Sequence, residues 1–299
     1  MNRLGKKLST PRLTTIYSFL LPGILVYAFI VFIPLLLSIY FSFYKWNGGL
    51  SKDFIGFHNY SQLIRDAKFW FSFRNNMIIT VLSIVGQLGI AFVLAVILQA
   101  KWVRLREFHR TVLFLPVVLP AVVVGFIWNL IYSQNYGILN GVLKGLHLQS
   151  WIHPWLDDPK IVIYSVTIPI IWQWIGLYLI IFMASLQSIP SEVYESAEMD
   201  GATGVKKVWF ITLPMMRDTL GVAVMLCISG NMKIFDNIFV MTGGGPGISS
   251  TVMAQYAYNT SFGQFKLGYG SAISIGMIII SLGLILLSRR LMGGRSVEP

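Results

Sequence analysis

The stretch IVIYSVTIPIIWQWIGLYLIIFMASLQSIPS, from Ile161 to Ser191, contains no charged residue. An α-helix needs about 20 residues to cross the hydrocarbon core of a bilayer, so this stretch is long enough to span a membrane. Four more uncharged runs of at least 22 residues lie at Leu13–Tyr44, Asn75–Ala100, Thr111–Leu143 and Leu267–Ser288. This repetition predicts a polytopic membrane protein.

The composition of the whole chain supports this prediction. Of its 299 residues, 55% are hydrophobic and 12% are charged, and the mean hydropathy is +0.68. Soluble domains carry roughly 25% charged residues. The net charge is +11, but the basic residues gather at the ends of the apolar runs, as in membrane proteins. We therefore expect contact with membrane lipid and not with nucleic acid. The single cysteine, Cys227, lies in an apolar stretch and is expected to be buried.

Six transmembrane helices are expected, at about 14–43, 73–99, 110–133, 160–187, 214–241 and 267–290. The fifth is the most interrupted, because it contains Arg217, Asp218, Lys233 and Asp236. Six spans place both termini on one side of the membrane. That side carries fourteen Lys and Arg residues, and the other side carries eight. The fourteen include Arg3, Lys6, Lys7, Arg12, Lys101 and Arg295. The positive-inside rule puts this side in the cytoplasm. The fold class is thus an all-α membrane protein, one domain over residues 1–299 with cytoplasmic termini.

Prolines interrupt several of the expected helices. Pro116 and Pro120 lie in the third and Pro169 in the fourth. Each removes a backbone donor and tends to kink a helix. Simple packing of curved helices and bowing around a pathway both explain such kinks, and proline alone does not decide between them.

The loop after the fourth helix reads IPSEVYESAEMDGATGVKKVWFITLP, from Ile189 to Pro214. It predicts two short helices, with Ser191 as N-cap of the first and Gly201 in a left-handed turn at its end. Val193 and Ala197 are spaced i, i+4 and give the first helix a small apolar face, expected to be exposed. On physical grounds alone, a docking element and an interfacial connector are equally good explanations.

Two motifs resemble those of bacterial ABC import permeases. Glu195-Ser196-Ala197, Asp200-Gly201-Ala202 and Ile211-Thr212-Leu213-Pro214 resemble the Glu-Ala-Ala (EAA) motif, with Ser196 in place of an alanine. Phe235-Asp236 followed by Thr242-Gly243-Gly244-Gly245-Pro246 resembles the MalF-like sugar-permease branch. The resemblance covers essentially the whole chain and implies the compact, six-span form of the type I ABC importer permease fold, in a bacterial inner membrane.

The resemblance also implies partners. Such a subunit pairs with a second, different permease, and the pair sits on two cytoplasmic ATPase subunits that hold ATP and Mg. An external solute-binding protein delivers the sugar. The chain itself has no phosphate-binding loop, and its four histidines lack metal-site spacing. It is therefore expected to bind no cofactor or metal and to be a transporter subunit, not an enzyme. The residues expected to engage an ATPase subunit through loop 189–214 are Glu195, Ser196, Ala197, Asp200, Gly201 and Ala202.

The solute pathway is expected along the fourth and fifth helices. Lys233 and Asp236 either pair with each other or face the cavity. The resemblance places a substrate-binding asparagine at Asn231, and we expect Asn231 and Trp172 to face one water-accessible space. The other candidates are Trp174, Gly176, Gly230 and Ile234. The external loop 242–266 is expected to be flexible at its start and to meet the binding protein through Gly243, Gly244, Gly245 and Pro246.

Other functions are kept as alternatives. A phosphorylated polyol is the second choice of solute, since relatives of this branch import such compounds. A secondary transporter would show inverted repeats or paired broken helices, which the sequence does not display. A membrane-embedded enzyme would need a nucleophile and base together, and the few polar groups in the apolar runs supply none.

Overall fold

The computed structural model describes residues 13–100 and 102–292. Four of the described helical stretches are long and apolar enough to cross a membrane, at Ile16–Phe41, Ala67–Gln99, Val162–Gln187 and Leu267–Met292. Two bent pairs meet the same criteria together, Arg106–Val118 with Ala121–Tyr132 and Gly204–Met215 with Arg217–Met232. Counting each pair as one span gives the six that the sequence predicts. Six of the basic residues used to orient the chain, Arg3, Lys6, Lys7, Arg12, Lys101 and Arg295, lie outside the described residues.

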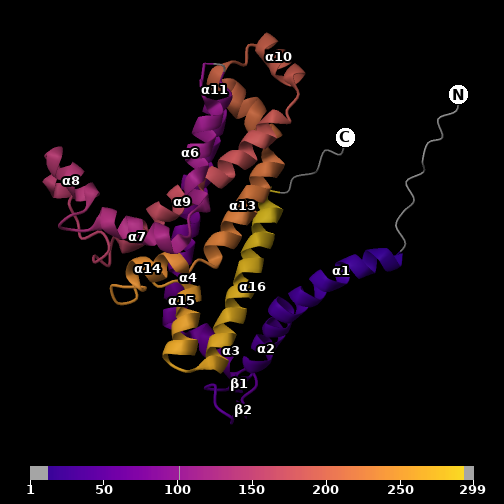
Figure 1. Ribbon diagram of the computed structural model, residues 1–299, viewed down its shortest axis with the longest axis vertical. Coiled ribbons are helices and arrows are strands. Elements are labelled where there is room, and N and C mark those ends of the chain that lie inside the picture. The colour runs from indigo at the N-terminus through magenta and orange to yellow at the C-terminus, as the bar shows by residue number, and fades with distance from the viewer. Residues whose placement is uncertain (1–12, 101, 293–299) are drawn as a thin grey trace.

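The chain begins with two long, segmented helices. The first comprises α1 (Leu13–Tyr27), the π-helical η1 (Ala28–Phe32) and α2 (Ile33–Phe41). A short hairpin of β1 (Tyr44–Lys45) and β2 (Asp53–Phe54) follows, with Tyr44 opposite Phe54. After α3 (His58–Arg65), the second comprises α4 (Ala67–Ser83), the π-helical η2 (Ile84–Leu88) and α5 (Gly89–Gln99). In Figure 1, β1, β2 and α3 lie at the end of the molecule opposite α10.

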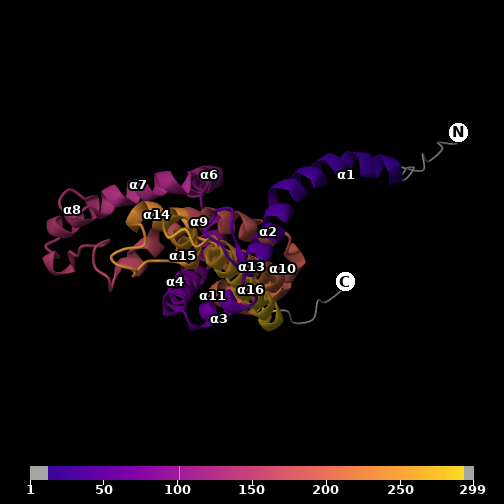
Figure 2. The ribbon, with the colours of Figure 1, turned by 90° about the horizontal axis from the view of Figure 1, so that it is seen from below.

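The remaining elements run from the middle of the chain to residue 292. They are α6 (Arg106–Val118), α7 (Ala121–Tyr132), α8 (Ile138–Gly145), η3 (Gln149–Trp151), α9 (Val162–Gln187), α10 (Ser191–Met199), α11 (Gly204–Lys207), η4 (Val208–Thr212), α12 (Leu213–Met215), α13 (Arg217–Met232), α14 (Asp236–Thr242), α15 (Met253–Tyr258), η5 (Asn259–Gly263) and α16 (Leu267–Met292). Helix α9 packs against α5 and α6, and α13 packs against α16. These contacts form the bundle in Figures 1 and 2.

The third predicted span is a sharply bent pair, not one helix over 110–133. Helices α6 and α7 meet at 99°. Leu119 is extended (φ −70°, ψ 134°) and Pro120 is the N-cap of α7. A residue before proline is disfavoured in the α region, and proline has no N–H to continue the α6 ladder, so the chain turns here. The predicted kink is confirmed, but its angle carries α7 out of the bundle to pack on α14.

The fifth predicted span, 214–241, is wrong as a single helix. The chain bends by 73° between Met215 and Arg217, so α13 starts at Arg217. A second break at Lys233–Phe235 separates α13 from α14. The π-helical η4 precedes Pro214, whose ring would clash with a regular preceding turn. The second break coincides with Lys233, where charge interrupts the apolar run.

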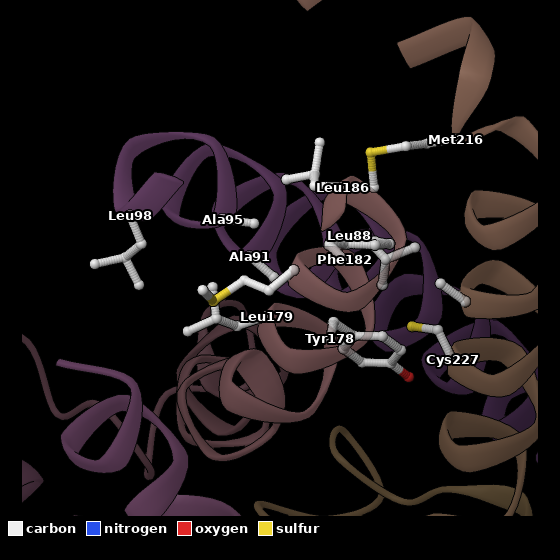
Figure 3. Packing of buried hydrophobic residues seen from close by; sticks show 12 residues of the cluster. Leu88, Ala91, Ala95, Leu98, Tyr178, Leu179, Phe182, Leu186, Met216 and Cys227 are labelled. Atoms are coloured by element: carbon white, nitrogen blue, oxygen red, sulfur yellow. The ribbon is translucent and has the colours of Figure 1, made fainter. Parts of the chain in front are cut away.

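One of three buried apolar clusters among the described residues lies where α5, α9 and α13 meet (Figure 3). Ala91 and Ala95 are fully buried and allow α5 to approach Leu179 and Phe182 of α9 closely. Cys227 of α13 is 1% exposed at the edge of this cluster, which confirms its predicted burial. Long-range contacts of this kind hold the polar residues of α9 and α13 in fixed positions around one cavity.

Candidate translocation cavity and coupling loop

A cavity of about 370 Å³ lies between α9 and the break that separates α13 from α14. The break itself contributes Lys233, Ile234 and Phe235 to the lining. Six of the eight residues predicted for the solute pathway line it, namely Trp174, Gly230, Asn231, Lys233, Ile234 and Asp236. The structure thus brings most of the predicted pathway residues together, and their contact with a solute stays a prediction.

Trp172 and Gly176 lie outside this cavity. Trp172 packs edge-to-face on Trp128 of α7, with ring centroids 6.0 Å apart. A Cβ at Gly176 would overlap the carbonyl oxygen of Leu113 and lie 2.7 Å from the Cα of Phe114. Gly176 therefore lets α9 and α6 touch through their backbones. The tryptophan that shares a cavity with Asn231 is Trp174, not Trp172. The two residues are two positions apart on α9, so their side chains point in nearly opposite directions, about 200° apart around the helix.

Asn231 is 4% exposed, and other protein groups satisfy much of its amide. Its Nδ2 donates to the carbonyl oxygen of Cys227 at 2.8 Å, and its Oδ1 accepts from Ser83 Oγ at 3.2 Å. The Nδ2 of Asn76 donates to its backbone carbonyl at 2.8 Å. The side chain joins α13 to α4, so it contributes to the wall of the cavity and to helix packing at once.

Lys233 and Asp236 do not form the ion pair considered from their spacing. In the part of the chain that the structure describes, the ion pairs within 4.0 Å are Glu107–Arg110 and Glu198–Lys207. Lys233 is the C-cap of α13 and Asp236 begins α14, so the helical i, i+3 geometry is lost between them. Both side chains are exposed and line the cavity. The cavity therefore carries one cation and one anion that are free to meet a ligand.

Two buried amide side chains that line the cavity, Gln87 and Asn237, were not among the predicted pathway residues. Gln87 of η2 is 2% exposed, and its Nε2 donates to the Ile170 carbonyl at 3.2 Å. Asn237 donates through Nδ2 to Gln173 Oε1 at 3.3 Å, and Gln173 in turn donates to the Leu119 carbonyl at 3.0 Å. These amides tie the bend of α6–α7 to α9 and α14. The signal that could have found them is an uncharged amide inside an apolar run.

Local hydrogen bonds define the end of α10 in loop 189–214. Gly201 has φ +78°, which confirms the predicted left-handed turn. The Ala202 N–H donates to the Ala197 carbonyl at 2.8 Å, and the Gly201 N–H donates to the backbone carbonyl of Glu198 at 3.1 Å. This is the Schellman arrangement that glycine favours. At the other end the N-cap is Pro190, without a side-chain cap bond, so the prediction of Ser191 as N-cap is wrong.

The face that α10 presents is not the predicted apolar one. Ala197 is 5% exposed and Val193 is partly buried, because this side of α10 is turned toward the protein. The exposed residues of α10 and its turn are Ser191, Glu192, Glu195, Ser196, Glu198, Met199, Asp200, Gly201 and Thr203. Ala202 is partly buried. Burial of the apolar side leaves an acidic face with one large apolar side chain, Met199, which is 89% exposed.

The glycine-rich segment after α14 is folded onto the protein. Gly243 and Gly244 have φ +59° and +91°, and the Nδ2 of Asn75 donates to the carbonyls of Ser249 and Thr251 at 3.0 and 2.9 Å. Gly244 is buried, and Gly245 and Pro246 are partly buried, whereas Gly243 is exposed. The expected flexible loop is therefore tied to α4, because few side chains allow its backbone to lie close to neighbouring groups.

No group of three or more His, Cys, Asp or Glu side chains that could hold a metal ion occurs within residues 13–100 and 102–292. Among these described residues, the cavity offers amide, aromatic, cationic and anionic groups. Such groups can bind a polar solute by hydrogen bonds and ring stacking.

Comparison with known proteins decides the family. Residues 87–293 match the model of the family described as binding-protein-dependent transport system inner membrane component. This chain belongs to that family. The chain is a multi-pass membrane protein, as predicted, and the matched region includes both the cavity and loop 189–214.

Individual relatives cover nearly the whole chain. The chain is 35% identical to the "Probable ABC transporter permease protein YurN" of Bacillus subtilis, over 92% of this chain and 94% of the relative. It is 31% identical to the "Sulfoquinovosyl glycerol transport system permease protein SmoG" of Agrobacterium fabrum, over 88% and 85%. A chain of a bacterial ABC transporter that imports the acidic polysaccharide alginate superposes with a TM-score of 0.81 at 22% identity, covering 93% of this chain and 95% of that chain. These findings confirm the all-α ABC importer permease fold.

Proposed function

We propose that this chain is a permease subunit of an ATP-driven, binding-protein-dependent sugar importer. The observation that carries the proposal is its similarity along nearly the full length to a permease for a glycosylated glycerol, together with the family match. The cavity at the α13–α14 break supplies the chemistry that a sugar needs. Amides and charged groups bind hydroxyls, and Trp174 offers an aromatic face for the apolar side of a sugar ring.

The proposed assembly contains a second, homologous permease, two cytoplasmic ATPase subunits and an external binding protein. The exposed surface of α1–α2 supports the presence of a second permease. In the most apolar 18-residue stretch of Ile16–Phe41, no residue is buried within the chain. Figure 2 shows α1 projecting away from the other helices. Lipid or another subunit must cover so apolar a helix. ATP and Mg belong to the ATPase subunits, which α10 and its turn would engage.

A reconstituted transporter tests the proposal. The chain is purified with its partner permease and ATPase subunits, placed in liposomes and supplied with the binding protein. Uptake is measured with neutral oligosaccharides, acidic oligosaccharides and glycerol 3-phosphate. Sugar uptake that requires both ATP and the binding protein supports the proposal. Uptake of glycerol 3-phosphate alone favours the phosphorylated-polyol alternative. Uptake driven by an ion gradient without the ATPase subunits contradicts the proposed class.

A further inference from the structure

Lys207 connects the two helices of loop 189–214. Its Nζ lies 2.8 Å from Glu198 Oε1 and 5.4 Å from the centre of the Tyr194 ring. Tyr194 and Glu198 are spaced i, i+4 and therefore lie on one face of α10, a turn apart. One ammonium group thus contacts two successive turns of α10 through an ion pair and a cation–π contact. Two contact points on one face restrict both the rotation of α10 and its angle to α11.

The position of Lys207 gives this contact a consequence for transport. Residues Gly204–Met215 form one helical stretch, which contains α11 and joins α13 at the 73° bend. The far end of α13 carries Gly230 and Asn231 at the cavity. Helix α10 is also joined to this stretch by the short turn Asp200–Thr203 and packs against α11. The contact of Lys207 therefore makes α10 move together with the helical stretch that leads toward the cavity.

We infer that Lys207 is a positioning residue for energy coupling: by holding Tyr194 and Glu198 it fixes the orientation in which α10 meets the ATPase subunit. This inference rests on the proposed function. The exposed acidic residues Glu192, Glu195 and Asp200 remain available to the partner, because Lys207 engages the neighbouring face of α10. Without Lys207, α10 populates several orientations, and only some of them pass a signal between the ATPase and the cavity.

The central experiment compares variants in the complete transporter with its binding protein. The measured quantity is the ratio of stimulated to basal ATP hydrolysis. Lys207→Met and Glu198→Gln should each lower this ratio by about two- to fivefold, as expected for one exposed ion pair. The double variant should lose no more than either single variant, since both remove the same contact. Lys207→Arg should keep the ratio, and so should the control Lys206→Met, which changes the adjacent exposed lysine.

Charge exchange and a distance measurement separate positioning from folding. The exchanged pair Glu198→Lys with Lys207→Glu should recover at least half of the lost stimulation. Spin labels on cysteines at Ser196 and Val205 should show a broader distance distribution with Lys207→Met, while Cys227 is buried and stays unlabelled. A variant that no longer copurifies with its partners, and is not rescued by the exchange, overturns the inference. The inference is also overturned if Lys207→Met leaves the ratio of stimulated to basal ATP hydrolysis unchanged, or if Lys206→Met lowers this ratio equally. If the unmodified transporter shows no stimulation by the binding protein, the proposed function itself fails.

Discussion

At the scale of single residues, the structure divides the predicted pathway residues into packing and ligand-facing groups. Asn231→Ala removes the acceptor of Ser83 and a bond to the Cys227 carbonyl, so we expect the free energy of unfolding to fall by about 1–3 kcal/mol.

Lys233→Met should lower uptake without changing stability, because Lys233 makes no ion pair among the described residues and faces the cavity. Thermal unfolding and uptake of both purified variants test this. Lost uptake with unchanged stability in Asn231→Ala would instead assign that amide to the solute.

Asp66, at the start of α4, offers a pH-dependent test. Its carboxylate accepts bonds from the hydroxyls of Tyr256 and Tyr269 and from the Lys68 N–H at 2.9 Å. Partial burial raises the pKa of Asp66, but these hydrogen bonds outweigh it and lower the pKa below the ordinary 3.8. A lowered folded-state pKa stabilises the protein above the unfolded-state pKa, and this stabilisation is lost as pH falls through the folded-state value.

The corresponding prediction concerns Asp66→Asn. At pH 7 it should cost about 1 kcal/mol, because a charged cap and two tyrosine partners are weakened. The difference between the two proteins should begin to shrink as pH falls below about 3.9, the unfolded-state pKa. It should vanish only below the lowered folded-state pKa, where the wild-type carboxyl is protonated in both states. Unfolding at a series of pH values measures the difference in stability between wild type and Asp66→Asn. Tyr256→Phe serves as a control that removes one hydrogen-bond donor and keeps the ring. A pH-independent difference would contradict the assignment.

At the scale of helices, the contact of α6 with α9 depends on Gly176. A Cβ there meets backbone atoms of Leu113 and Phe114, which cannot move aside as a side chain can. Gly176→Ala should therefore destabilise the protein by about 1–3 kcal/mol or prevent assembly. Gly230→Ala is the matched control, because nothing lies within 4 Å of its added Cβ. Yield and thermal unfolding in detergent measure both, and equal stability of the two variants would refute the close contact.

At the scale of the whole molecule, two exposed residues in different loops allow the orientation in the membrane to be tested. Ile248 is 42% exposed in the segment after α14, and Met199 is 89% exposed on α10. We expect a cysteine at Ile248 to react with an impermeant thiol reagent added outside the cell. A cysteine at Met199 should react only after the membrane is opened. The single native cysteine is buried and gives a low background. The reverse pattern of labelling would invert the predicted topology.

The sequence by itself determined the features that depend on local chemistry. Apolar runs long enough to cross a bilayer determined that the chain is an all-α membrane protein. They also determined the number of spans, when each bent pair is counted as one span. Gly201 predicted a left-handed turn correctly, because that conformation depends on one residue lacking a Cβ. Pro120 marks the kink between α6 and α7 because proline has no N–H to continue the helix and restricts the residue before it. Pro116 and Pro169, in contrast, lie inside α6 and α9. The motif in loop 189–214 predicted the family, which the comparison of residues 87–293 confirms.

Only the tertiary structure decided which side each helix presents. Trp172 and Trp174 are alike in sequence, but α9 packs so that Trp174 reaches the cavity and Trp172 lies on Trp128. Ala197 and Val193 turned inward because neighbouring elements bury them, and the break after α13 separated Lys233 from Asp236. These outcomes depend on contacts between residues far apart in the chain. A spacing pattern defines a helix face, but the partner that covers the face comes from the packing of the whole bundle.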